Sequence, residues 1–122
     1  MWKSVTTPYQ NINCIFPTKQ KPIGKMVSLC IKDKNIKRVI VFGSSTMARC
    51  NLWSDIDIYF EFDKEPFRYP CIKDPNEVFD KFNNFSLSQE FKDMIYEEGV
   101  IVYEREPSLS ILIGKRENCK KE

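Results

Sequence analysis

Hydrophobic and polar side chains alternate most regularly over residues 55–63. One face of this segment carries only large apolar side chains: Ile56, Ile58, Phe60 and Phe62. The other face carries acidic residues and a tyrosine, and alternation of this length is typical of a β-strand with one buried side. A second strand is predicted over residues 38–42, where an unbroken apolar run ends at Gly43.

Two further segments have apolar residues at helical spacing. Between Pro22 and Asp33 they recur at intervals of three and four, which predicts an amphipathic helix with a proline in its first turn. A second helix is predicted to open at a capping box, Ser86 to Gln89, and to end at Gly99.

The order of these elements predicts the fold class. With shorter strands expected over residues 78–82 and 100–103, the chain forms a small mixed β-sheet with helices packed on it, in the α/β (α+β) class. A length of 122 residues suits a single domain. We predict an irregular N-terminal arm over residues 1–20, the folded domain over 21–106 and a C-terminal tail over 107–122.

Composition excludes several kinds of chemistry. The chain has no histidine, so Ser-His and Cys-His nucleophile pairs are absent, and carboxylates or metal ions must carry any catalysis. Its five cysteines are widely spaced, which favours reduced thiols in the cytoplasm over a disulfide framework or a zinc site. No apolar run approaches the roughly 18 residues of a membrane span, so we expect no membrane insertion.

Charge is distributed unevenly, although the formal net charge is only +2. Residues 1–49 contain nine lysines and arginines and one acidic residue, whereas residues 50–106 contain six and fourteen. This asymmetry indicates a basic part that faces anionic groups and an acidic part that binds cations. A nucleic-acid-binding domain that uses the basic part is an alternative, but the solvent-facing side of a helix also accounts for many of these lysines.

Asp55 and Asp57 share the polar face of the predicted strand 55–63. Residues two apart on a strand point the same way, about 6.6 Å apart along the backbone. Converging carboxylates repel each other, and a divalent cation relieves the repulsion; ligands that are all oxygen favour Mg²⁺ or Mn²⁺. Taken alone, such a pair is also typical of an ordinary solvated strand face.

A turn that suits an anion precedes this strand. Gly43 and Ser44 directly follow the apolar run, and ten residues separate them from Asp55. Backbone N–H groups at such a turn bind phosphate, although Gly-Ser alone is also typical of a plain turn. A phosphate cradle together with an acidic strand describes a site for a nucleoside triphosphate and its Mg²⁺.

The segment VFGSSTMARCNLWSDIDIYFEF resembles the signature of the nucleotidyltransferases related to DNA polymerase beta, in which Gly-Ser precedes Asp-x-Asp at this spacing. The short chain is most similar to the minimal nucleotidyltransferases (MNT), which are often paired with HEPN-type proteins in toxin–antitoxin modules. The ending IYEEGVIVYERE also resembles the closing helix and strand of that family. The similarity covers residues 23–106 and implies a polymerase beta palm-like nucleotidyltransferase fold.

The resemblance implies catalytic and metal-binding roles for three aspartates. Asp55 and Asp57 would ligate two Mg²⁺ or Mn²⁺ ions. The family's third carboxylate lies on a later strand and is best matched by Asp80. Glu77 and Asp74 are rivals for this role, because the intervening segment is rich in proline and departs from the family's usual helix.

The resemblance also implies how the nucleotide is held. Gly43 and Ser44 would bind the triphosphate through the N–H groups of the turn and the hydroxyl. Ser45 stands where the family commonly has an arginine, and Arg49 would supply a phosphate contact in its place. The alternative for Arg49 is an ordinary surface side chain.

The function implied is a metal-dependent nucleotidyltransferase that transfers a nucleoside monophosphate, AMP from ATP foremost, to a hydroxyl of a protein or RNA acceptor. Such a protein would be a cytoplasmic antitoxin of a HEPN/MNT-type pair. The alternative is a catalytically weak or inactive binding module on the same fold, which neutralises a partner protein by contact.

Overall fold

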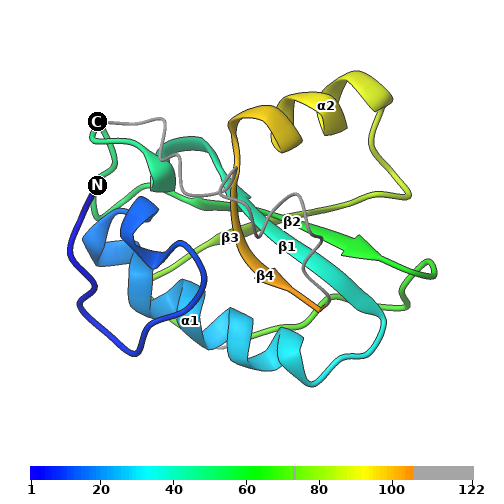
Figure 1. Ribbon diagram of the computed structural model, residues 1–122, viewed down its shortest axis with the longest axis horizontal. Coiled ribbons are helices and arrows are strands. Elements are labelled where there is room, and N and C mark those ends of the chain that lie inside the picture. The colour runs from blue at the N-terminus through cyan, green and yellow to red at the C-terminus, as the bar shows by residue number, and fades with distance from the viewer. Residues whose placement is uncertain (73, 106–122) are drawn as a thin grey trace.

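The computed structural model describes residues 1–72 and 74–105, which form a four-stranded mixed sheet with two α-helices (Figure 1). The elements in chain order are η1 (Ile12–Cys14), α1 (Pro17–Ile31), β1 (Ile36–Phe42), η2 (Gly43–Thr46), β2 (Ile56–Phe62), β3 (Phe79–Asn83), α2 (Gln89–Glu98) and β4 (Val100–Glu104). The predicted α+β class is confirmed. Within the described residues, no helix has both the length and the apolar character needed to cross a membrane.

The strands lie in the order β3-β2-β1-β4. β1 pairs antiparallel with β2 on one side and with β4 on the other, whereas β2 and β3 are parallel. Parallel neighbours require a crossover. The described part of the segment between β2 and β3 contains no helix, and its Tyr69 and Ile72 pack against the core.

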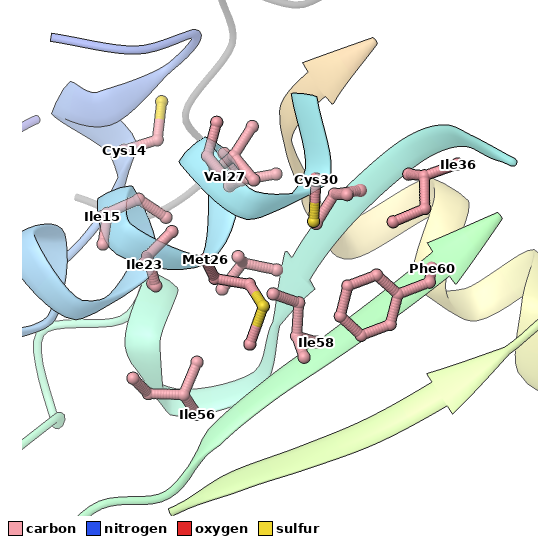
Figure 2. Close-up of a cluster of buried hydrophobic side chains, with 14 of the residues drawn as sticks. Cys14, Ile15, Ile23, Met26, Val27, Cys30, Ile36, Ile56, Ile58 and Phe60 are labelled. Carbon is pink, nitrogen blue, oxygen red and sulfur yellow. The ribbon is translucent and has the colours of Figure 1, made fainter. Parts of the chain in front are cut away.

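One α-helix packs on each face of the sheet (Figure 1). The larger apolar cluster joins α1 to one face and includes Ile23, Met26, Val27 and Cys30 of the helix with Ile36, Ile56, Ile58 and Phe60 of the strands (Figure 2). On the other face, Ile95 of α2 packs with Ile40, Phe42, Tyr59 and Ile101. Each helix therefore buries the apolar side chains of its own face, which is the usual arrangement for a sheet covered on both sides.

The strand predicted from alternation is observed as β2. Its apolar residues lie on the α1 side, so Asp57 and Glu61 share the opposite face with Tyr59. The alternation in the sequence thus determined which side chains point away from the main core.

Helix α1 begins at Pro17, five residues before the predicted proline start. Pro17 occupies the first turn, where a missing N–H is harmless. The residues that follow it break the apolar pattern because two polar side chains, Lys19 and Gln20, are fully buried. The Gln20 amide is satisfied by backbone groups of the N-terminal segment: Val5 N–H donates to Oε1 and Nε2 donates to Lys3 O.

Helix α2 begins at Gln89, and the capping box predicted at Ser86 is wrong. Ser88 is the N-terminal cap, and its hydroxyl accepts a hydrogen bond from Phe91 N (3.2 Å). The helix ends before Gly99, as predicted. A Cβ at this position would lie 2.4 Å from Ile40 Cγ2, so close packing against β1 requires glycine.

The prediction of reduced thiols holds for part of the chain only. Cys30, Cys50 and Cys71 are free, whereas Cys14 is disulfide-bonded, which corrects that prediction at this position. Burial raises the pKa of the Cys30 thiol to about 12, so it stays protonated and unreactive at neutral pH.

Candidate active site

Gly43 and Asp57 are in direct contact where β1 ends and β2 begins. Phe42 is the register partner of Asp57, so the next residue, Gly43, lies against the Asp57 side chain. Gly43 has φ +78°, a conformation that side chains with a Cβ rarely adopt. A Cβ there would also lie 2.4 Å from Asp57 Oδ2. Both the backbone conformation and the close approach therefore require glycine at the predicted phosphate turn.

Asp57 and Asp80 are register partners on the parallel strands β2 and β3. The pKa of Asp57 is raised to about 6, mainly by burial, then by the charge of Asp80 and a hydrogen bond with it, and finally by the charge of Asp55. All these causes disfavour the ionised form. Because a pKa of about 6 still lies below 7, Asp57 is mostly ionised at neutral pH, with the acidic groups of Asp80 and Asp55 acting on it.

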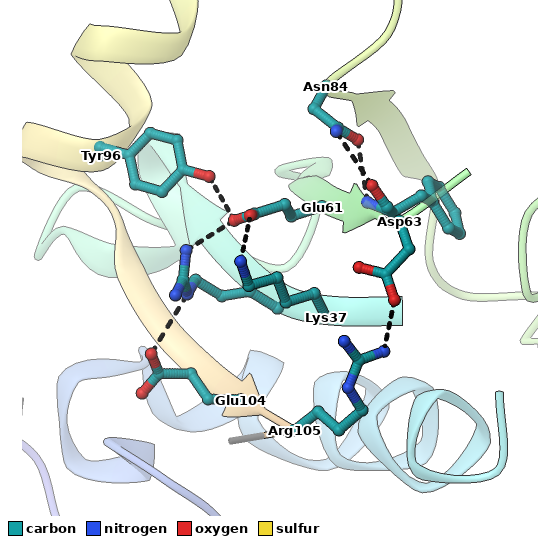
Figure 3. A network of polar contacts seen from close by, with 9 residues as sticks. Lys37, Glu61, Asp63, Asn84, Tyr96, Glu104 and Arg105 are labelled. Atoms are coloured by element: carbon teal, nitrogen blue, oxygen red, sulfur yellow. Dashed lines mark hydrogen bonds and ion pairs between the residues drawn. The ribbon is translucent and has the colours of Figure 1, made fainter. Parts of the chain in front are cut away.

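A network of charges on the same sheet face is fully compensated (Figure 3). Arg38 lies between two carboxylates, with Nη1 2.6 Å from Glu61 Oε1 and Nε 3.1 Å from Glu104 Oε2. The Tyr96 hydroxyl donates to Glu61, and Lys37 lies 3.7 Å from it. These carboxylates stabilise the end of the sheet and leave little charge for a ligand.

The three aspartates differ from that network. Among the described residues, no lysine or arginine forms an ion pair with Asp55, Asp57 or Asp80. Asp55 lies one residue before β2 and is exposed, and its charge acts on Asp57. Their negative charge is therefore available to a cation from solution.

These carboxylates fit a magnesium ion that a phosphate helps to hold. Over residues 1–72 and 74–105, no three His, Cys, Asp or Glu side chains form a ready-made metal site. Mg²⁺ seldom uses such a site, because it keeps several waters and is bound through one or two carboxylates plus substrate phosphates. Asp57 and Asp80, which are register partners, would serve as such a pair, and the turn at Gly43 lies against Asp57.

The rivals for the third carboxylate are engaged elsewhere. Glu77 Oε1 lies 2.7 Å from Lys19 Nζ in an ion pair that is almost completely buried. Asp74 Oδ1 accepts a hydrogen bond from Asn76 N (3.0 Å), which closes a local turn. Of the three candidates, Asp80 is the one that the strand register aligns with Asp57.

The other predicted nucleotide ligands are placed differently. Ser44 is partly exposed beside Gly43. Ser45 is fully buried, and its carbonyl accepts a hydrogen bond from Phe16 N (2.8 Å), so its hydroxyl does not face solvent. Arg49 is exposed, its Nε lies 3.2 Å from Met47 Sδ, and it makes no ion pair with a described carboxylate. The structure therefore places Gly43 against Asp57 and buries Ser45, whereas the exposed Arg49 side chain forms no ion pair with a described carboxylate.

Lys19 stabilises the two loops that lead to Asp57 and Asp80, and no signal in the sequence indicated this role. Its side chain is fully buried, which is rare for lysine unless it is paired. Its Nζ donates to Ser54 O and Glu77 Oε1, each at 2.7 Å, and to Leu52 O at 3.4 Å. Lys19 thus fastens α1 to the loop before β2 and to the loop before β3, which lead to Asp57 and Asp80.

Comparison with known proteins adds no relative: no protein-family model, no curated protein and no solved structure matches this chain significantly. The fold and the site together define an α+β domain with an uncompensated aspartate pair beside a glycine turn. Any functional assignment depends on this geometry.

Asp57 makes the stability of the fold depend on pH. Its pKa is about 6 in the folded chain and near the usual 3.8 in the unfolded chain, so folding takes up a proton between these values. The contribution of Asp57 to stability is therefore fully present below about pH 4 and is lost as the pH rises through 6. The full shift corresponds to about 3 kcal/mol, and partial exposure reduces the expected effect to about 1–2 kcal/mol.

The Asp57→Asn variant lacks this titration. We expect urea unfolding to show that the variant gains about 1–2 kcal/mol relative to the parent chain between pH 4 and pH 7. Asp93→Asn, at an exposed position of α2, serves as the control. An equal difference between variant and parent at both pH values would contradict the raised pKa.

Proposed function

We propose that this chain is a metal-dependent nucleotidyltransferase with a polymerase beta palm-like fold, which transfers a nucleoside monophosphate from its triphosphate to a hydroxyl of a protein or RNA. One observation carries the proposal. Gly43, at positive φ, lies against Asp57, and Asp57 is aligned with Asp80. A glycine turn and two uncompensated carboxylates thus occupy the same end of neighbouring strands, which supports a site for a triphosphate with its cation.

Each residue at the site has a separate task in this proposal. Asp57 and Asp80 hold the cation, and Asp55 adds negative charge at its exposed edge. Gly43, without a Cβ, and Ser44 leave backbone N–H groups open to the phosphates. A bound Mg²⁺ would supply neutralisation of the phosphate charge and a lowered pKa for the attacking hydroxyl.

The reaction replaces a phosphoanhydride bond of the triphosphate by a phosphate ester bond to the acceptor. The acceptor oxygen forms a bond to the α-phosphorus, the bond between that phosphorus and the bridging oxygen breaks, and pyrophosphate leaves with the electron pair. The hydroxyl proton passes to solvent or to a carboxylate of the site. Positioning and charge neutralisation supply most of such catalysis, which is consistent with a chain that has no histidine.

Transfer of a radiolabel tests the proposal. The purified chain is incubated with α-labelled ATP, CTP, GTP or UTP, Mg²⁺ and a cell extract, in parallel with Asp55→Ala, Asp57→Asn and the control Asp93→Asn. We expect a labelled macromolecule with the parent chain and the control, and a loss of at least about 10²-fold with Asp57→Asn.

The outcome separates the enzyme from the binding module. The absence of labelled product from the parent chain would overturn the proposal. Labelling that survives both Asp55→Ala and Asp57→Asn would assign the activity to another site. A HEPN-type partner that is still neutralised by Asp57→Asn would favour the binding module.

A further inference from the structure

A hollow of about 470 Å³ opens beside Asp55. Its two walls are residues 52–55, which precede β2, and residues 75–78, which precede β3. This volume lies within the range of small-molecule sites in proteins. The hollow is distinct from the Asp57–Asp80 pair, but it shares Asp55 with the proposed active site.

The hollow is lined by large apolar side chains that are exposed to solvent. Trp53 is 89% exposed, Leu52 64% and Val78 57%. An indole exposed to this extent beside two aliphatic side chains is a surface that gains from being covered by an apolar or aromatic group.

The two walls are held in place without a ligand. Fully buried Lys19 binds carbonyls of one wall and the Glu77 carboxylate of the other. The N–H of Ile56, the residue that directly follows the first wall, donates to Val78 O of the second wall (2.8 Å). The hollow is therefore preformed, which lowers the entropy that a ligand must lose on binding.

Turns within the first wall hold the Trp53 backbone. Trp53 N donates to Asn51 Oδ1 (2.8 Å), and Asn51 N donates to Ser54 Oγ (3.1 Å). The loop that presents the indole is thus ordered by its own hydrogen bonds.

We infer that this hollow binds the base of the nucleotide, with Trp53 as the stacking surface; the inference rests on the proposed function and specifies its substrate. A nucleobase has apolar faces and polar edges, and aromatic side chains stack on any base. Asp55 lines the hollow and its charge acts on Asp57, so the hollow is connected to the carboxylates that would hold the cation of the same nucleotide.

The polar groups of the second wall select among bases. Glu77 lines the hollow; Lys19 binds its Oε1, and the carboxylate, which is 10% exposed, only accepts hydrogen bonds when it is ionised. The edges of adenine and cytosine carry an exocyclic amino group that donates, whereas the same edge position in uracil is an accepting carbonyl. The Glu77 carboxylate therefore favours a base that carries an amino group over uracil.

Calorimetric titration in Mg²⁺ tests the inference on the full chain. The ligands are ATP, UTP and tripolyphosphate, which has no base. The proteins are the parent chain, Trp53→Ala and, as a matched control, Phe67→Ala, because Phe67 is fully exposed in a different loop. Trp53 is itself so exposed that its replacement is compatible with folding, and the melting temperature verifies this.

We expect ATP to bind the parent chain more tightly than UTP. Trp53→Ala is expected to weaken ATP binding about 10-fold and to leave the affinity for tripolyphosphate unchanged. The control Phe67→Ala is expected to change neither affinity. Unchanged ATP affinity, or equal weakening for tripolyphosphate, would overturn the base site. If Trp53→Ala changed the sedimentation of the chain but not its affinity for ATP, the hollow would be a contact between copies of the chain. That result would also overturn the base site.

Different results would overturn the base site and the transferase activity. Label transfer that is unaffected by Trp53→Ala at all ATP concentrations leaves the enzyme in place and removes the base site. ATP binding that depends on Trp53, with no label transferred by the parent chain, retains the base site and removes the transferase.

Discussion

The Gly43→Ala variant is expected to lose at least about 10²-fold in nucleotidyl transfer and to unfold more easily by about 1–3 kcal/mol. The stability loss has two sources. An alanine at φ +78° is strained by about 1–2 kcal/mol, and its Cβ would meet Asp57 Oδ2 at 2.4 Å. The transfer loss follows because the Asp57 carboxylate must rotate away from the turn, and displacement by about 1 Å can reduce a rate by that factor.

A double-mutant cycle separates the two effects. In the Asp57→Ala background the clashing carboxylate is absent, so Gly43→Ala should cost only the backbone strain. Urea unfolding of the four proteins measures the coupling, which we expect to exceed about 0.5 kcal/mol, as for residues in contact. Mg²⁺ in the presence of ATP should raise the melting temperature of the parent chain much more than that of Gly43→Ala. Additive effects of the two substitutions would show that Gly43 and Asp57 are not in contact.

The Lys19→Met variant is expected to lose about 3–5 kcal/mol of unfolding free energy. The change leaves the Glu77 carboxylate, which is 10% exposed, without its cation, and removes the donor to Leu52 O and Ser54 O. Breaking a buried ion pair by removing one partner has a cost of about this size, because the remaining charge stays desolvated. Domains of this kind have a total stability of about 5–15 kcal/mol, so this single substitution removes a large part of it.

Two further variants make this result specific. Lys25→Met replaces an exposed lysine of the same helix and should change the unfolding free energy by no more than about 0.5 kcal/mol. Lys19→Met combined with Glu77→Leu removes both charges and should recover a substantial part of the loss. Urea unfolding measures all three, and a Lys19→Met chain as stable as Lys25→Met would show that the pair contributes nothing.

Two kinds of element could be predicted from the sequence with different success. β2 followed from local alternation, because a strand with one buried face imposes a period of two on its own residues. The start of α1 could not be predicted in this way, because Lys19 and Gln20 are buried, whereas a pattern of apolar residues treats polar positions as exposed. Buried polar residues depend on partners distant in the sequence, such as Glu77, and a local pattern contains no information about them.

The candidate site divides in the same way. Gly43 and Asp57 could be proposed from their types and spacing, since a glycine after a buried strand and an acidic pair on an alternating strand are local features. Asp80 could not be separated from Glu77 and Asp74, because these residues differ only in what the parallel pairing of β2 and β3 brings beside them. The pKa of Asp57 likewise depends on that pairing and on burial.

The sequence by itself determined the class of the fold, the strand that carries Asp57 and the glycine turn before it, because these follow from side-chain periodicity and backbone conformation over a few residues. Only the tertiary structure decided that Asp80 aligns with Asp57, that Ser45 is buried, and that Lys19 holds both loops. The physical reason is that strand register, burial and ion pairing join residues far apart in the chain, and their energies arise only once those residues are packed together.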